Sequence, residues 1–510
     1  MSNMQRGRGV KLCTALGLAL MAVLLLSNVT AAKTRCDFNT QRVQCGDFAC
    51  DKKAHICIAC RTDSDCYPDA MSCDMTSGKC KVRGFTSLFG ARTIFTMLGT
   101  FLICSIAVIA GVGGGGILVP LFCGIMKIPM QFAVGMSQAT ICGQSTVSMY
   151  LIVQQKHPDS SWDRPLINYQ YLSLILPLGL IGTLIGGILS KLCPDVLRLL
   201  LLFVILSAAL YRTSVKVVKQ YKQDTNAWQV TVEADGENAA SQQGNYGNND
   251  ERQGYELINR AVDAKSESRQ GTTVLATSGH SLPAFENPPQ SQYPQQELAM
   301  NFTCFLVLLL FNILRMYLVC GGLLYWLCVL IPLVFLSTVF YLNYEKLRKL
   351  VESDSAQVTF AWTQKNTVMY PMVAVIAGAS AAMLGIGGGL VLGFVLNEVG
   401  LVPQQASATG GMATFFIAFS SVLELLVTGH LVVDFGIVFC IVGLCSGSLG
   451  QFVFMEYIKG HGLNYLIIGS LAFVLGGSLV SLGGYGIYTT AISVHAGRSL
   501  MAFGHLCARA

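Results

Sequence analysis

Two glycine clusters are the residues of this sequence best suited to bind a ligand through the backbone. Residues 111–133 read GVGGGGILVPLFCGIMKIPMQFA and residues 385–407 read GIGGGLVLGFVLNEVGLVPQQAS, so a constant offset aligns the two stretches without a gap. We expect each cluster to break a helix, because a glycine costs about 1 kcal/mol relative to alanine in a helix interior. Paired interruptions in the apolar segments of two halves are the best sequence indicator of a transporter's binding site.

A broken helix of this kind offers chemistry suited to an anion. A glycine run leaves backbone N–H groups pointing into a cavity, and a helix that begins after it adds the positive end of its dipole. Hydroxyl and amide side chains in the following runs add neutral donors. The sequence therefore predicts two facing half-sites for one small anion, with these substrate-binding residues: Gly113, Gly114, Gly115, Ser137, Gln138, Gly387, Gly388, Gly389, Gln405, Ser407 and Thr409.

A purely structural interpretation competes with this one. Glycine clusters also let helices approach closely, and hydroxyl groups in membrane helices often bond to their own backbone. The presence of two aligned copies, each followed by a polar run, favours a function.

Ionisable residues are few inside the apolar runs, and each is a functional candidate by default. Glu424 lies deep in its run and is the candidate for carrying a coupling proton. Arg315 would offer its charge to an anion, pair with another residue, or snorkel to an interface. Glu398 lies near Gly400 and is expected to cap a helix, and Glu456 lies at a segment boundary.

Composition places the chain in a lipid bilayer. Of its 510 residues, 53% are hydrophobic and 12% are charged, against about 25% charged in globular proteins. The net charge of +6 and the lack of a long basic run argue against a nucleic-acid partner. Neither glycine cluster leads to Gly-Lys-Ser or Gly-Lys-Thr, so no P-loop is predicted. We expect a non-enzyme without a cofactor.

The apolar runs repeat one plan, and the fold class expected is an all-α polytopic membrane protein. Two four-segment repeats carry the glycine-broken helices, and a two-helix insert separates them. The first repeat is expected at 85–212, with runs at 93–118, 131–153, 166–190 and 195–212. The insert hairpin is expected at 299–344, a polar connector at 345–366, the second repeat at 367–488 and a tail at 489–510.

The chain begins with a predicted signal peptide and a cysteine-rich extracellular or lumenal module. Residues 1–32 have a basic start, an apolar core and small residues for cleavage. An even number of cysteines in residues 33–84 predicts four disulfides, and a zinc site at Cys57 and Cys60 is the weaker alternative. The pairing is open among Cys36, Cys45, Cys50, Cys57, Cys60, Cys66, Cys73 and Cys80. The module either guards the outer face or binds a ligand.

Residues 213–298 are polar and predict a disordered linker. Basic residues beside it, including Arg212 and Lys216, indicate a cytosolic position. That position requires each repeat to cross an odd number of times, so we expect the glycine-broken stretch only to dip into the membrane and the repeats to be inverted. Residues 255–258 (Tyr-Glu-Leu-Ile) resemble a sorting signal for trafficking adaptors. Asn301 heads an N-glycosylation acceptor expected to be unused.

At the glycine clusters the sequence resembles the sulfite exporter TauE/SafE family of membrane proteins. GVGGGGILVP and MLGIGGGLVLGFVLNEVGLVPQQASATGGMATFFIAFSSVLE carry the resemblance, which covers about residues 90–490. It implies transport of a small anion, typically sulfite, a sulfonate or sulfate. The resemblance assigns functional positions only to the glycine motifs, Pro129, Pro403 and the Ser/Thr positions that follow. Residues 132–135 (Phe-Ala-Val-Gly) depart from residues 406–409 (Ala-Ser-Ala-Thr), so the second half-site is expected to contribute more.

The function predicted is secondary transport of a small anion by alternating access. The alternative is a cell-surface receptor or scaffold that binds a ligand through the cysteine module. We expect a multi-pass protein of the secretory pathway, residing in the plasma membrane and able to form a homo-oligomer.

Overall fold

The structure is a computed structural model that describes residues 36, 45, 48–67, 70–156, 164–193, 197–201, 203–218, 292–319, 321–353, 358–460 and 464–495. The expected signal peptide at 1–32, the motif at 255–258 and most of the expected linker lie outside the described residues.

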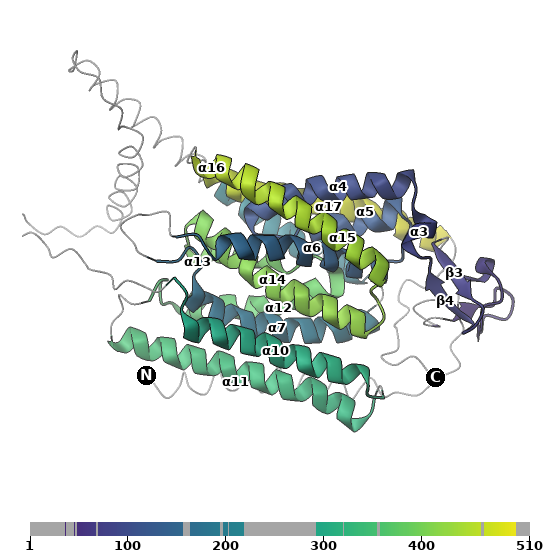
Figure 1. Cartoon of the computed structure of the whole chain (residues 1–510), viewed down its shortest axis with the longest axis horizontal. Helices are drawn as coiled ribbons and strands as arrows, with labels where there is room; N and C mark the ends of the chain where they lie inside the picture. Colours follow the sequence, from purple (N-terminus) through teal and green to yellow (C-terminus); the bar gives the residue numbers. More distant parts are fainter. Residues whose placement is uncertain are drawn as a thin grey trace, which may run out of the picture.

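Long apolar helices run side by side in a bundle, and the cysteine module lies at one end of it (Figure 1). Within the described residues, nine helical segments are long and apolar enough to cross a membrane. The all-α membrane fold is therefore confirmed. Shorter helices accompany these nine segments. In chain order, the α-helices of the bundle are α4 (Ala91–Ala107), α5 (Gly115–Ile125), α6 (Met130–Ile152), α7 (Tyr169–Leu192), the helix Leu197–Val218, α10 (Gln295–Met316), α11 (Leu323–Ser353), α12 (Tyr370–Leu384), α13 (Gly389–Val399), α14 (Pro403–Val427), α15 (Val433–Leu449), α16 (Glu456–Gly460) and α17 (Asn464–His495).

The cysteine module consists of two small antiparallel hairpins and a short helix. Strand β1 (Ala49–Cys50) pairs with β2 (Cys57–Ile58), β3 (Met71–Asp74) pairs with β4 (Lys79–Val82), and α3 (Phe85–Leu88) follows. The expected four disulfides are present. They join Cys36 to Cys50, Cys45 to Cys57, Cys60 to Cys73, and Cys66 to Cys80.

Two groups of contacts identify the ends of the bundle. At the module end, the Phe85 ring meets the Phe435 ring near the start of α15, with centroids 5.3 Å apart. At the linker end, Gln292 donates to the Gln154 carbonyl just after α6, and Lys216 pairs with Glu398 at 3.2 Å. The helix Leu197–Val218 therefore ends opposite the cysteine module.

The first glycine cluster turns the chain back on itself. After α4 and the short helix η2 (Val108–Ala110), residues 111–114 form a turn and α5 begins. A β-carbon placed on Gly114 would lie 3.2 Å from the Ile103 side chain, and one on Gly99 would lie 3.6 Å from Leu121. Helices α4 and α5 are thus an antiparallel hairpin that enters from the module end. Helices α6, α7 and Leu197–Val218 then run the length of the bundle.

The second cluster makes the same turn in the opposite direction. The π-helix η4 (Lys365–Met369) and α12 lead to residues 385–388, where the chain reverses into α13. The Asn366 amide contacts the Val399 carbonyl at 3.5 Å, so this hairpin opens toward the linker end. Helices α14, α15 with its π-helical continuation η5 (Gly450–Met455), and α17 complete the repeat. The two repeats have the expected inverted relation.

Some boundaries differ from those expected. Helix α11 continues to Ser353, into the range expected as a polar connector, and α17 continues to His495, into the expected tail. The amphipathic end of α11 supports this extension, because Arg348 pairs with Glu345 and Glu352 one turn away. Asn301 is fully buried in α10, as expected for an unused glycosylation acceptor.

Candidate functional site

The two glycine turns touch each other inside the bundle. A β-carbon on Gly115, at the start of α5, would collide with the carbonyl oxygen of Gly385 in the opposite turn. One on Gly389, at the start of α13, would lie 3.1 Å from the Gly111 carbonyl oxygen. Only the absence of side chains permits this approach, so the contact between the two turns has its cause in these glycines.

Backbone conformation also requires glycine at the turns. Gly111 and Gly114 have φ values of 68° and 66°, and Gly385 and Gly387 have values of 76° and 77°. These lie in the left-handed region, which side chains disfavour. The turns reverse the chain within a few residues and leave α5 and α13 with their N-termini at the contact.

Backbone N–H groups at both turns have no hydrogen-bond partner among the described residues. In the first turn they belong to Gly113, Gly114, Gly115 and Gly116, and in the second to Ile386, Gly387, Gly388 and Leu390. All of these residues are buried. Buried N–H groups are nearly always paired in folded proteins, and an unmet donor costs about 1–3 kcal/mol. Such a concentration of free donors at two helix N-termini is the arrangement that binds an anion.

The predicted polar residues bond to the carbonyl groups of these turns. The Ser137 hydroxyl donates to the Gly385 carbonyl oxygen at 2.7 Å, and the Gln138 amide donates to the Ala381 carbonyl at 2.9 Å. From the other repeat, the Ser407 hydroxyl donates to the Ile109 carbonyl at 2.8 Å. These donors therefore hold each turn against the other repeat, and their predicted contact with an anion stays a prediction.

The other two predicted polar residues lie outside this contact. Thr409 accepts a hydrogen bond from the backbone N–H of Asn168 at 3.0 Å, which joins α14 to the start of α7. Gln405 is half-buried in the first turn of α14, and no hydrogen bond joins it to either glycine turn in the described part of the chain.

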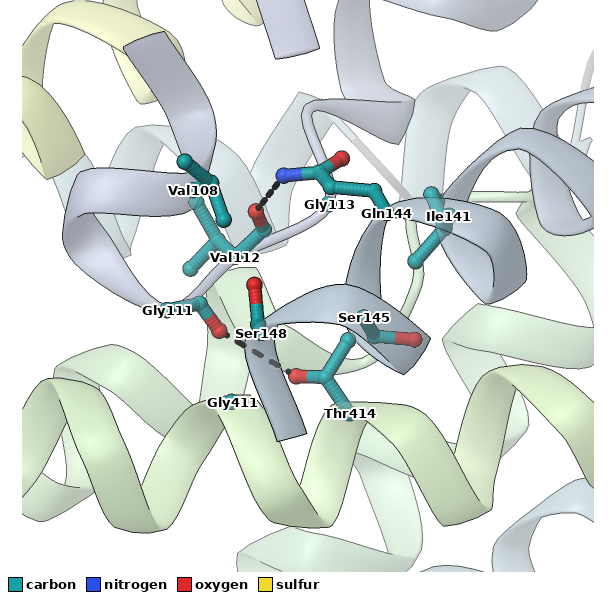
Figure 2. Close-up of a pocket in the computed structure, with 10 residues that line it drawn as sticks. All are labelled: Val108, Gly111, Val112, Gly113, Ile141, Gln144, Ser145, Ser148, Gly411 and Thr414. Atoms are coloured by element: carbon teal, nitrogen blue, oxygen red, sulfur yellow. Dashed lines mark hydrogen bonds between the residues drawn. The ribbon is translucent and has the colours of Figure 1, made fainter. Parts of the chain in front are cut away.

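A small pocket lies against the first turn (Figure 2). Its cavity volume is about 10 Å³, roughly the space that one water molecule needs. Gln144 donates to the Val112 carbonyl at 3.1 Å, and Thr414 donates to the Gly111 carbonyl at 3.3 Å. The lining residues are uncharged: Val108, Gly111, Val112, Gly113, Ile141, Gln144, Ser145, Ser148, Gly411 and Thr414.

The pocket lies against the first turn, and the expectation that the second half-site contributes more stays a prediction. Gln144 and Ser148 of α6 and Thr414 of α14 are the polar side chains in the pocket lining, together with Ser145. Ser148 and Ile141 were not among the sequence candidates, although Ser148 follows Gln144 by one helical turn.

The buried acid Glu424 is paired. The Arg315 guanidinium on α10 contacts the Glu424 carboxylate on α14, and their side chains are 2% and 3% exposed. Of the roles considered for Arg315, pairing is the one observed. Glu398 pairs with Lys216 near the end of α13.

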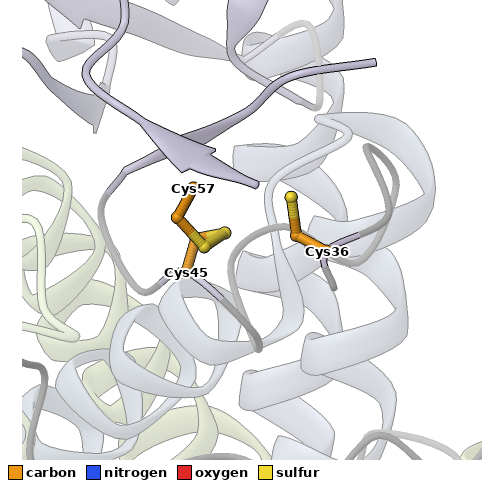
Figure 3. A group of neighbouring side chains, drawn as sticks. All are labelled: Cys36, Cys45 and Cys57. Atoms are coloured by element: carbon orange, nitrogen blue, oxygen red, sulfur yellow. A yellow bond between two sulfur atoms is a disulfide. The ribbon is translucent and has the colours of Figure 1, made fainter. Parts of the chain in front are cut away.

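The cysteine module brings three sulfur atoms together at two places, one of which is Cys36, Cys45 and Cys57 (Figure 3). Cys60, Cys66 and Cys80 form the other group. All six belong to disulfides, and a metal ligand must be a thiolate. The arrangement therefore favours the disulfide module over the zinc alternative.

Comparisons with known proteins agree with this architecture. The profile of the family described as Sulfite exporter TauE/SafE matches residues 96–241, which include the first glycine turn. "Sulfite exporter TauE/SafE family protein 3" of Arabidopsis thaliana is 26% identical over 435 residues, covering 82% of this chain and 83% of the relative. "Sulfite exporter TauE/SafE family protein 1" of the same plant is 22% identical and covers 78% and 84%. No solved structure matches the chain.

The relatives align over most of their own length and over most of this chain. The chain is similar, over most of its length, to proteins of the sulfite exporter TauE/SafE family.

Proposed function

We propose that the protein is a secondary transporter of a small, sulfur-containing oxyanion, which binds at the junction of the two glycine turns. The observation that carries the proposal is the set of buried backbone N–H groups at the N-termini of α5 and α13, which have no partner among the described residues. In a bilayer, backbone polar groups without partners are tolerated only where they are buried in protein or line a wet cavity.

The carbonyl groups of the turns support an anion in preference to a cation. Ser137 bonds to Gly385, Ser407 to Ile109, Thr414 to Gly111 and Gln144 to Val112. Each of these bonds occupies a carbonyl oxygen that would otherwise repel an anion or attract a cation. The groups left for a ligand are therefore N–H donors. Neutral donors bind an oxyanion without the tight retention that a buried cation would cause.

The inverted hairpins supply the alternating access. The α4–α5 hairpin opens toward the module end and the α12–α13 hairpin toward the linker end, with their tips in contact. A small movement of one repeat against the other would expose the contact to one end and then to the other. Sulfite, sulfonates and sulfate are the substrate class because the relatives carry "sulfite exporter" in their names.

Flux of labelled sulfite, sulfate and a sulfonate through proteoliposomes that contain the full chain tests this proposal. We expect saturable flux of at least one of the three, and inhibition by the other two, because they share the same acceptor oxygens. Arg348→Gln is the matched control, since Arg348 lies exposed on α11 away from the turns and its loss leaves flux unchanged. Equal flux in protein-free vesicles and in proteoliposomes, for all three anions, would contradict the proposal.

The chain is proposed to lie in the plasma membrane with its cysteine module outside the cell and the linker end in the cytosol. Basic residues concentrated at the linker end support this orientation, among them Arg212, Lys216, Lys346, Arg348 and Lys349. An epitope tag placed between residues 84 and 85 is expected to bind antibody on intact cells, whereas a tag at residue 240 is expected to require permeabilisation. The reverse pattern would reverse the orientation.

A further inference from the structure

We propose that Arg315 and Glu424 form a second anion site, in which protonation of Glu424 releases Arg315 to hold the transported anion. The inference rests on the proposed function and adds to it a coupling ion and the residues that carry it. Neither side chain belongs to the glycine turns.

The arginine is buried with unused hydrogen-bonding capacity. Its guanidinium contacts Glu424 through Nη2 and lies 5.5 Å from the centre of the Tyr325 ring on α11. Its Nη1 is buried and has no hydrogen-bond partner among the described residues. An arginine retained for packing alone would be expected to satisfy all its donors, because an unmet buried donor on a charged group is especially costly. A buried guanidinium N–H without a partner suits an additional oxygen ligand.

Helix α14 connects this pair to the glycine turns. Thr414, which contacts the first turn, Ser421 and Glu424 follow one another at helical spacings of seven and three residues and so share a face. Ser420, beside them, lies 3.1 Å from the Thr183 hydroxyl on α7. From Thr414 to Glu424 the helix rises about 15 Å. A row of buried polar groups therefore leads from the proposed binding site toward the module end.

Glu424 is packed against the backbone of α7. A β-carbon on Gly187 of α7 would lie 2.5 Å from the Glu424 Oε1 atom, so the carboxylate lies directly on the α7 backbone. The titratable groups that face the pair are Tyr325 and Cys328 of α11, and α7 contributes none among its described residues. Glu424 is thus the only carboxylate of this site within the described part of the chain.

The pair exists on one side of the molecule only. The position that matches Glu424 in the first repeat is Tyr150, which is exposed. Arg315 comes from the insert, which lies between the repeats and has no counterpart within either. The insert and α14 therefore add an acid–base pair that breaks the inverted symmetry of the two repeats. Such a pair suits a coupling step that occurs at one end of the molecule only.

The proposed step balances in charge. With Glu424 ionised, its carboxylate neutralises Arg315 and excludes an anion. One proton from the solvent neutralises the carboxyl group and leaves the guanidinium positive, and one negative charge of the anion then takes the place of the carboxylate. When the anion leaves, the proton leaves with it and the ion pair forms again. One proton thus moves with each anion.

Sulfate and a sulfonate are the probes for this step, because both keep their charge between mildly acidic and neutral buffers, whereas sulfite does not. In proteoliposomes, an inward proton gradient is expected to drive accumulation by the wild-type chain. Glu424→Gln is expected to reduce this accumulation by about tenfold or more, and to reduce exchange without a gradient far less. Arg315→Gln is expected to raise the KM for exchange by about tenfold. Arg348→Gln serves as the control.

A fluorescence measurement tests binding of the anion independently of flux, with Arg315 and Glu424 both unchanged. Trp326 lies beside Tyr325, with ring centroids 5.7 Å apart. In a variant with Trp162, Trp228 and Trp362 replaced by phenylalanine, sulfate is expected to change Trp326 emission in acidic buffer and to have little effect in neutral buffer. The inference is overturned if Glu424→Gln still accumulates anion on a proton gradient, or if sulfate leaves Trp326 unchanged at both pH values. Absence of flux for every anion in the wild-type chain, by contrast, would overturn the proposed function itself.

Discussion

Gly115→Ala is expected to abolish anion flux, although it adds only one methyl group. The added β-carbon would collide with the carbonyl oxygen of Gly385, and would lie 2.8 Å from the Ile386 Cα atom and 2.9 Å from the Ile141 side chain. The first two are backbone atoms, which cannot rotate away as the end of a side chain can. The two turns must therefore move apart, at a cost of about 1–3 kcal/mol or more, and the donor groups of the two repeats no longer surround one point.

Gly124→Ala in the same helix is the matched control. No atom lies within 4 Å of a β-carbon placed on Gly124, and alanine favours the helix by about 1 kcal/mol. We expect wild-type flux and an equal or higher Tm for this variant. For Gly115→Ala we expect a lower Tm together with background flux. A folded Gly115→Ala protein with wild-type flux would show that the contact between the turns is not the binding site.

The break in each glycine cluster could be predicted because its cause is local. Glycine weakens a helix wherever it occurs, so Gly111 and Gly385 indicate a turn without knowledge of their neighbours. The inverted relation of the repeats followed from the positions of basic residues and the number of membrane crossings. Both can be read along the sequence without knowledge of the folded structure. Disulfide number was predictable for the same reason, whereas the pairing of Cys36 with Cys50 depends on the module's folded path.

The roles of the polar residues could not be predicted, since their partners are distant in sequence. Ser137 and Gly385 are separated by 248 residues, and Ser407 and Ile109 by 298. Whether a hydroxyl faces a ligand or a carbonyl depends on the rotation of one helix against a turn of the other repeat. Local patterning identifies the donors as buried and polar, but the packing of the repeats decides what they bond to.

The same limit applies to Arg315 and Glu424, 109 residues apart. Each was identified as an ionisable residue within an apolar run, and only the placement of the insert against α14 makes them a pair. Their proximity means that neither residue should be interpreted alone, because the charge of one sets the cost of burying the other.

Removal of one member of this pair is therefore expected to destabilise the protein more than removal of both. Arg315→Met or Glu424→Leu alone leaves a buried charge without its partner, since both side chains are at most 3% exposed. Such a loss costs about 3–5 kcal/mol, whereas replacing both members by apolar residues is often close to neutral. Thermal unfolding of the purified proteins in detergent measures the difference. We expect each single variant to have a clearly lower Tm than the wild type.

The double variant separates a buried pair from two unrelated side chains. With both charges removed, the introduced methionine and leucine side chains can pack together between α10, α14 and α7, so the Tm is expected to return most of the way to the wild-type value. Lys346→Met and Glu297→Leu, a pair at 2.9 Å whose lysine is 48% exposed, give the comparison, because surface pairs contribute only about 0–1 kcal/mol. Additive losses in the Arg315 and Glu424 double variant would contradict direct coupling. A recovered Tm with lost proton-driven accumulation would show that the charges are retained for transport, at no gain in stability.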